Sequence, residues 1–346
     1  MDEASNSRID ALCHRHCAFA LYRLPGEKEA MHFCMQADGG VSQRREGECG
    51  FLLVPFEGEA LFIRKERDTP PPAGLFALLA PQRPKTPATT QEDYGRLFAL
   101  YRAQMPSPLH KIVLARTEDV PRAPDFSPSA ALLQACQRFP LHMNALLHTA
   151  EHGTWLCSTP ELLLRGRGRE WQTMALAGTR PAAGDADIPW DSKNRREQAL
   201  VSDFILQCLQ PLWEGGTLSG PTTLRTGKIE HLCTRFSFRM PTGRLEKLLS
   251  TLPPTPAVCG YPLSEARAWL REQPDIVRGL YAGYFGSIGR EEVQLYVTLR
   301  CMRLYADCCR LYAGGGLMPD SKADAEWSET QAKMQGMRQL LSLKKQ

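Results

Sequence analysis

Acidic side chains stand on the apolar faces of two predicted helices. Glu197 precedes Leu200, Val201 and Phe204 by three, four and seven residues, so the four side chains share one helix face. A carboxylate that points toward a core is costly unless it is paired or binds a cation. Glu197 is therefore a candidate metal ligand.

The last predicted helix repeats this pattern. Glu326, Glu329 and Lys333 follow the spacing i, i+3, i+7, and the stripe continues as the apolar residues Met337, Leu340 and Leu341. Carboxylates from two helices suit Mg²⁺ and leave positions open for an anionic ligand. The alternative, which the spacing by itself favours, is an exposed Glu329–Lys333 pair and a Glu197 near a solvated helix start.

A lysine and a glutamate are candidates for proton transfer. Lys111 lies in an apolar strand at 109–116, where it is either a buried proton acceptor or an edge-strand lysine that blocks aggregation. Glu161 follows Pro160 at the end of another predicted strand. A carboxylic acid with a raised pKa could protonate a leaving group there, and the alternative is an ordinary glutamate at the start of a helix or turn.

Two glycine stretches and an arginine could hold a carboxylate. Gly178-Thr179 and Gly314-Gly315-Gly316 allow backbone amides to approach an anion, with plain turn chemistry as the alternative. Arg300 could bind a carboxylate through two hydrogen bonds, and the alternative is a surface arginine on a half-buried sheet. Neither glycine stretch has the spacing of a nucleotide-binding loop.

The elements that must position these residues are strands in groups with helices between them. We expect strands at 19–24, 31–35, 50–55, 60–64 and 109–116, a proline-rich connector at 68–87, and hairpins at 144–158 and 294–313. We expect a helix from Thr89, with Glu92 completing a capping box, another opening at Ser127-Pro128, and long helices at 193–212 and 323–343. This order favours an α+β fold with largely antiparallel sheets.

Composition narrows the class of protein. The 346 residues carry a net charge of +4, which is too small an excess to indicate a nucleic-acid partner. The 12 cysteines lack zinc-like spacing, which favours free thiols in a reducing cytosol. The N-terminal segment has no signal-peptide core, and no apolar run is long enough to span a membrane.

In their order along the chain, these stretches resemble the chorismate-binding enzyme family, which includes isochorismate, salicylate, anthranilate and aminodeoxychorismate synthases. The matching segments are KIVLAR (111–116), STPEL (158–162), ALAGTR (175–180), KNRRE (193–197), PTPAVCG (254–260), YAG (281–283), LR (299–300), YAGGGL (312–317) and EWSE (326–329). The resemblance covers about residue 90 to the C-terminus. It divides the chain into a variable β-rich part at 1–88 and a catalytic part at 89–346.

The resemblance implies a fold and a set of roles. The fold would be a sandwich-like core of large antiparallel sheets surrounded by helices. Glu197 and Glu329 would bind Mg²⁺ directly, with Glu326 supporting them. Lys111 would activate water, and Glu161 would protonate the departing hydroxyl of chorismate. The residues implied to hold the substrate are Ala177, Gly178, Thr179, Thr255, Tyr281, Arg300, Gly314, Gly315, Gly316 and Lys333.

Two positions discriminate among the activities of this family. Members that use ammonia commonly carry glutamine where Lys111 stands, so a lysine fits a water nucleophile and an isochorismate synthase. Ala177 replaces the nucleophilic lysine of aminodeoxychorismate synthases. The segment 178–181 (GTRP) also resembles anthranilate synthases. The sequence is also compatible with a salicylate synthase or a non-catalytic chorismate-binding subunit. We further expect a cytoplasmic monomer without an obligate protein partner, serving menaquinone or siderophore synthesis.

Overall fold

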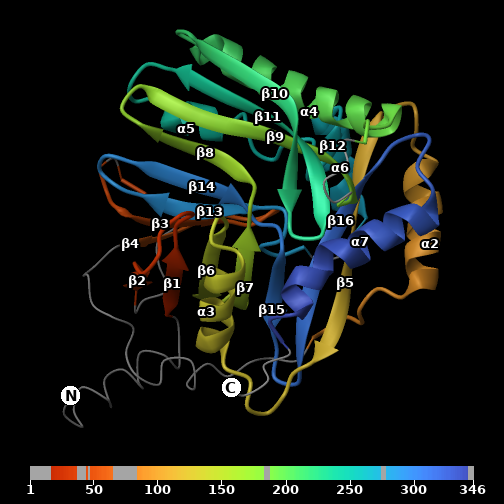
Figure 1. Ribbon diagram of the computed structural model, residues 1–346, viewed down its shortest axis with the longest axis horizontal. Helices are drawn as coiled ribbons and strands as arrows, with labels where there is room; N and C mark the ends of the chain where they lie inside the picture. The colour runs from red at the N-terminus through yellow and green to blue at the C-terminus, as the bar shows by residue number, and fades with distance from the viewer. Residues whose placement is uncertain are drawn as a thin grey trace.

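Two antiparallel sheets of eight strands each form the body of the molecule (Figure 1). The computed structural model describes residues 17–36, 44–45, 47–64, 84–182, 188–273 and 278–341. Helices lie around the sheets, so the predicted α+β class with antiparallel sheets is confirmed.

The first sheet contains most of the strands that carry candidate catalytic residues. Its order is β12 (Gly260–Tyr261), β5 (Lys111–Pro121), β16 (Cys308–Leu317), β15 (Cys301–Leu304), β7 (Gly153–Thr159), β6 (Met143–Thr149), β1 (Ala18–Arg23) and β2 (His32–Gln36). The predicted hairpin at 144–158 is confirmed as β6–β7. The strand expected at 109–116 begins at Lys111 and continues to Pro121.

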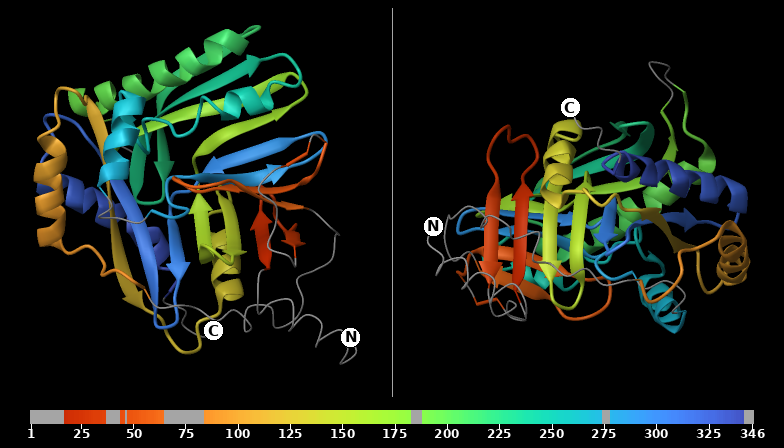
Figure 2. Two further views of the ribbon diagram at one scale, coloured as in Figure 1. Left: turned by 180° about the vertical axis from the view of Figure 1, so that it is seen from behind. Right: turned by 90° about the horizontal axis from the view of Figure 1, so that it is seen from below.

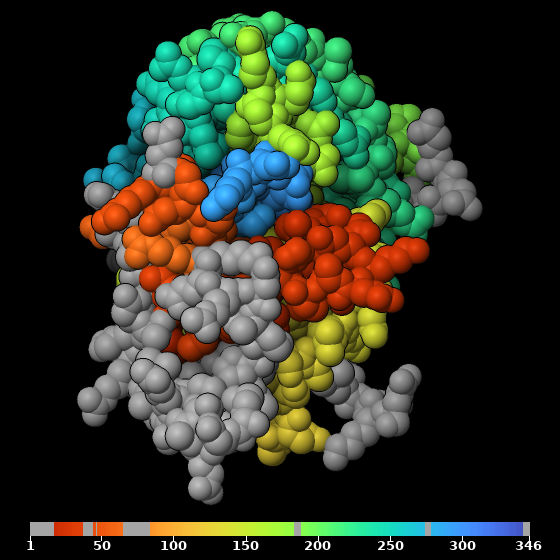
Figure 3. All heavy atoms as spheres, turned by 90° about the vertical axis from the view of Figure 1, so that its left-hand side faces the viewer, coloured from red at the N-terminus to blue at the C-terminus, as the bar shows by residue number. Residues whose placement is uncertain are grey.

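The second sheet carries the Ala177–Thr179 segment. Its order is β10 (Gly216–Thr226), β11 (Ile229–Arg239), β9 (Glu170–Pro181), β8 (Leu162–Arg167), β14 (Val293–Val297), β13 (Tyr284–Ile288), β3 (Gly50–Val54) and β4 (Leu61–Arg64). The four N-terminal strands thus extend both sheets. Figure 3 shows this part of the chain, in red and orange, beside the blue β13–β14 region on one face of the molecule.

Helices cover the sheets and bring site residues to them. The helices are α2 (Gln91–Arg102), α3 (Pro128–Arg138), α4 (Ser192–Leu209), α5 (Leu245–Leu249), α6 (Leu263–Glu272) and α7 (Ala323–Arg338), and a 3-10 turn at Gln210–Leu212 follows α4. Helix α4 packs on β9 and β11, and α7 packs on β16 (Figure 2). Among the described residues, no helix is both long and apolar enough to cross a membrane.

The core explains why the strands of the first sheet are apolar on both faces. Ala18, Ala20 and Tyr22 of β1 face the main core between the sheets. Phe19 and Leu21 of the same strand face a second core, which α3 and α7 cover with residues that include Ala131, Leu132, Met334 and Met337. Sheets buried on both faces show near-continuous apolar runs rather than alternation.

Two local predictions need correction, and two others stay open. The capping box of α2 is Thr90 with Asp93, one residue beyond the predicted Thr89 and Glu92, because Thr90 accepts the backbone N–H of Asp93. The predicted hairpin at 294–313 is wrong: β14 belongs to the second sheet, and β16 pairs with β15 instead. Much of the proline-rich connector lies outside the described residues, and the division at residue 88 stays a prediction.

Candidate active site

A cavity of about 60 Å³ gathers most of the candidate residues. It lies where β9, β11 and β16 meet helices α4 and α7. The predicted residues that line it are Glu161, Ala177, Gly178, Thr179, Glu197, Tyr281, Arg300, Gly314, Gly316 and Lys333. These residues span much of the sequence, so the fold brings them together as one polar site.

The three glycines of β16 let the strand pass close to charged side chains. A Cβ at Gly316 would overlap Glu197 Oε1 and lie 2.6 Å from Lys111 Cε. A Cβ at Gly315 would lie 2.7 Å from Glu326 Oε2, and one at Gly314 would lie 2.8 Å from the Tyr281 hydroxyl. A side chain at these positions would therefore displace the Tyr281 hydroxyl or the charged groups, and the plain-turn alternative fails for this stretch because it is a strand.

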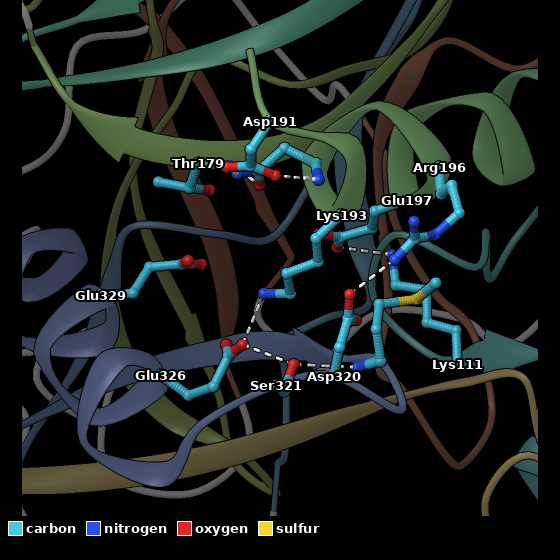
Figure 4. Close-up of polar contacts among 12 residues, drawn as sticks. Lys111, Thr179, Asp191, Lys193, Arg196, Glu197, Asp320, Ser321, Glu326 and Glu329 are labelled. Carbon is cyan, nitrogen blue, oxygen red and sulfur yellow. Dashed lines mark hydrogen bonds and ion pairs between the residues drawn. The ribbon is translucent and has the colours of Figure 1, made fainter.

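Each of the three candidate metal-ligating carboxylates contacts a lysine. Figure 4 shows the contact between Lys193 and Glu326. Glu197 Oε1 lies 2.9 Å from Lys111 Nζ, and Glu329 Oε1 lies 2.6 Å from Lys333 Nζ. Glu326 Oε1 accepts a hydrogen bond of 2.6 Å from Lys193 Nζ. Within the part of the chain that the structure describes, no three acidic, histidine or cysteine side chains form a group that could hold a metal ion.

Glu326 keeps a raised pKa in spite of its contact with Lys193. Burial and then repulsion from Glu329 raise its pKa, against the opposing effect of Lys193. Its Oε1 also accepts a hydrogen bond of 2.7 Å from Ser321 Oγ, whereas its buried Oε2 has no hydrogen-bond partner. The pKa of Lys193 is raised, because Glu326 and Glu197 outweigh the opposing effect of burial. An unpartnered buried carboxylate oxygen is a position where a hard cation would be stabilised.

Lys111 is fully buried and lies beside the cavity rather than in its wall. Strand β5 runs between β12 and β16, so the edge-strand alternative is wrong. The Lys111–Glu197 contact is an ion pair by distance, but Lys111 Nζ makes no hydrogen bond of good geometry. Burial raises the pKa of Glu197, but the charges of Lys111 and Lys193 outweigh this effect and lower it overall.

Glu161 has the properties of a proton donor near neutral pH. It lies in the link between β7 and β8, so the helix-start alternative is wrong. Burial raises its pKa to about 7, even though Lys111, Arg300 and Lys333 favour its ionised form. A carboxyl group with this pKa is partly protonated at neutral pH, which is what a general acid needs.

Arg300 is positioned by a histidine that the sequence did not reveal. His231 Nε2 lies 3.1 Å from Arg300 Nη2, and His231 Nδ1 lies 3.1 Å from the carbonyl oxygen of Gly178. The carbonyl requires a hydrogen on Nδ1, which leaves the Nε2 lone pair to accept from the guanidinium. Burial and then the charge of Arg300 hold the pKa of His231 well below its usual range, so the ring stays neutral.

The backbone around Arg300 and Gly178 adopts left-handed conformations. Arg300 has φ +43° and Gly178 has φ +74°. Among the described residues, no carboxylate forms an ion pair with Arg300, so its charge is available to an anionic ligand in the cavity. The backbone N–H of Thr179 donates to Asn194 Oδ1 of α4 at 3.1 Å, which ties the Ala177–Thr179 segment to that helix.

Five predicted residues do not line the cavity: Lys111, Thr255, Gly315, Glu326 and Glu329. Glu329 and Lys333 form the pair that the surface interpretation proposed, but their side chains are only 19% and 15% exposed. Thr255 is buried, and its hydroxyl has no hydrogen-bond partner. Sequence reasoning missed His231 and Lys193. Lys193 stood within the KNRRE match, whereas no spacing pattern marked His231.

Comparisons with known proteins agree with this geometry. The family model described as "chorismate binding enzyme" matches residues 86–342, so the chain belongs to the chorismate-binding enzyme family. It is 35% identical over 334 residues to the salicylate biosynthesis isochorismate synthase of Pseudomonas aeruginosa, covering 88% of this chain and 68% of that protein.

Two further comparisons come from Escherichia coli. The chain is 32% identical over 248 residues to the isochorismate synthase MenF, covering 68% of this chain and 56% of that protein. The chain thus spans little more than half the length of this relative. The solved structure of the menaquinone-specific isochorismate synthase MenF superimposes with a TM-score of 0.75 at 22% identity, over 99% of this chain and 92% of that structure. This likeness shows a shared fold.

Proposed function

We propose that this chain converts chorismate to isochorismate by adding water at C2 with loss of the C4 hydroxyl. The observation that carries the proposal is Glu161, a buried acid with a pKa of about 7 in the same cavity as the cation Arg300. The names of the relatives support this reaction. It is acid–base chemistry on a small dianionic substrate.

The residues in and beside the cavity have separate roles in this reaction. Arg300, Tyr281 and the backbone of Gly314 and Gly316, which line the cavity, hold the side-chain carboxylate of chorismate, and Gly315 lies between the two glycines outside the wall. Lys333 lies next to them. Glu161 gives its proton to the departing C4 hydroxyl, which leaves as water. Lys111 takes the proton from the attacking water. Because Lys111 is paired with Glu197 as an ammonium ion, it acts as a base only after it has lost a proton and that contact is released.

We also propose that Mg²⁺ binds next to Gly315 and Gly316. Glu197, Glu326 and Glu329 supply the hard oxygen donors that this ion prefers, and Glu326 Oε2 is buried without a partner. When bound, the ion would hold the ring carboxylate and offset negative charge. The lysines that now contact these carboxylates would have to move away from them.

Separation of reaction products tests the proposal. The chain is incubated with chorismate and Mg²⁺, and a Lys111→Gln variant serves as the matched control. We expect isochorismate from the unaltered chain, and bound but unreacted chorismate with the variant. Near-normal turnover by Lys111→Gln would refute the base assignment. Fluorescent salicylate would indicate a salicylate synthase, and an aminated product formed with ammonia would indicate an anthranilate-type activity.

The pathway that the reaction serves, and the location and oligomeric state of the protein, stay predictions. Isochorismate feeds both menaquinone and siderophore synthesis, and the names of similar proteins include a menaquinone-specific isochorismate synthase and a salicylate biosynthesis isochorismate synthase. We retain the predictions of a cytoplasmic monomer that acts on a small molecule without nucleic acid, membrane or an obligate protein partner.

A further inference from the structure

A second cavity of about 100 Å³ adjoins the reaction cavity and shares two cations with it. It lies between the second half of α7 and the turn that joins β10 to β11. Arg300 and Lys333 line both cavities. Lys228 and Ala332, which also line the second cavity, are exposed, so this cavity opens to solvent.

The second cavity has the charge of an anion site. Lys228, Arg300 and Lys333 contribute to its wall, and none of the residues that line it is acidic. Among the described residues, neither Lys228 nor Arg300 forms an ion pair with a carboxylate. Thr226 adds a buried hydroxyl that has no hydrogen-bond partner. These groups match the oxygens of a carboxylate, which accepts charge-assisted hydrogen bonds from lysine and arginine.

The remaining wall is apolar and partly aromatic. Phe139 stacks on His142 with ring centroids 5.0 Å apart, and Met337 and Ile229 lie around the same space. Sulfur–aromatic contact and ring stacking favour a flat ring over an aliphatic chain. An apolar cavity of about 150 Å³ holds one benzene molecule. The cavity of about 100 Å³ is smaller than this, so a six-membered ring would enter it only in part, with the rest of the ring in solvent.

We propose that this second cavity binds a small aromatic carboxylic acid, with its carboxylate on Lys228 and Arg300 and its ring against Phe139 and Met337. The occupant draws on Arg300 and Lys333, which also face the reaction cavity. Because both ligands use the same two cations, binding at one cavity should weaken binding at the other. The two ligands weaken each other by the same factor. Aromatic acids arise when isochorismate loses pyruvate, so such a ligand belongs to the chemistry that consumes the proposed product.

Direct binding of salicylate tests this inference without any turnover. Its dissociation constant is measured by titration calorimetry for the unaltered chain and two pairs of variants. Lys228→Gln removes one cation of the second cavity, and Arg225→Gln changes an exposed cation of the same hairpin that lies outside it. Ala332→Phe fills the cavity from α7, and Ala325→Phe places the same ring on an exposed position two turns earlier.

We expect salicylate to bind the unaltered chain and both controls alike. Loss of a charged hydrogen bond of about 1.5 kcal/mol predicts roughly tenfold weaker binding to Lys228→Gln. Ala332→Phe should weaken binding at least as much. No binding to the unaltered chain, equal loss in Arg225→Gln, or unchanged binding by Ala332→Phe would overturn the inference. The last result would place salicylate in the reaction cavity. The binding experiment contains no chorismate, so its result does not depend on turnover. A failed product assay would therefore count against the proposed reaction and not against the second cavity.

Discussion

The substitution Glu161→Gln should stabilise the protein at alkaline pH while it strongly lowers activity. Burial raises the pKa of Glu161 from its ordinary value of 4.5 to about 7. When the pKa of a carboxyl group is higher in the folded state than in the unfolded state, ionisation of that group destabilises the folded state. This destabilisation begins as the pH rises past the pKa of the unfolded state, and it reaches its full rate of increase with pH between the two pKa values and its full size above the pKa of the folded state. The cost therefore grows from about pH 4.5 to pH 7. Glutamine has nearly the same shape and never ionises.

The size of this effect follows from the pKa difference. About 1.4 kcal/mol per pKa unit predicts roughly 3 kcal/mol of extra stability for Glu161→Gln at pH 8, and little near pH 4. An unfolding entropy of about 2.1 cal/mol/K per residue over this chain length converts that energy into a Tm increase of roughly 4 °C. Loss of the general acid should also lower kcat by about 10²–10⁴-fold.

Calorimetric unfolding at pH 5 and pH 8 checks the stability effect, and steady-state kinetics checks the activity. Glu151→Gln is a suitable control, because that glutamate is exposed in the β6–β7 turn. A Glu161→Gln variant with an unchanged or lower Tm at pH 8 would contradict the argument that burial sets the state of this carboxyl group.

Three further predictions concern the walls of the site. His231→Gln removes the ring that accepts a hydrogen bond from Arg300. The loss of a charged hydrogen bond of about 1.5–3 kcal/mol should raise the KM for chorismate roughly 10–100-fold, with a smaller change in kcat. An unchanged KM would exclude the positioning role of His231. Gly316→Ala should remove activity because its Cβ overlaps Glu197, whereas Gly95→Ala in α2 has open space and should retain it; an active Gly316→Ala enzyme would refute the close-approach argument. Initial rates measured across pH should fall about tenfold per unit above pH 7 as Glu161 ionises; a flat profile from pH 6 to 9 would exclude Glu161 as the acid.

Sequence reasoning succeeded where the controlling interactions are local. The β6–β7 hairpin and the Ser127 cap of α3 depend on neighbouring residues, and both were predicted. Helical spacing showed that Glu197 and Glu326 share a face with apolar residues, and both are buried, although the spacing by itself favoured an exposed position. Family resemblance then grouped residues that spacing alone could not connect.

Pairings between distant residues were not accessible from one sequence. Lys193 reaches Glu326 across 133 residues, and Arg300 reaches His231 across 69. These contacts depend on how the two sheets are ordered and on where α4 and α7 cross them. The same limit explains the failed hairpin at 294–313, since β14 finds its partners in β8 and β13 rather than in the next strand.

The most direct test of the central claim is the origin of the new hydroxyl oxygen. The chain is incubated with chorismate and Mg²⁺ in water enriched in oxygen-18, and the product is analysed by mass spectrometry. Water addition at C2 with loss of the C4 hydroxyl predicts isochorismate that carries one heavy oxygen. Unlabelled isochorismate, or no isochorismate at all, would contradict the account.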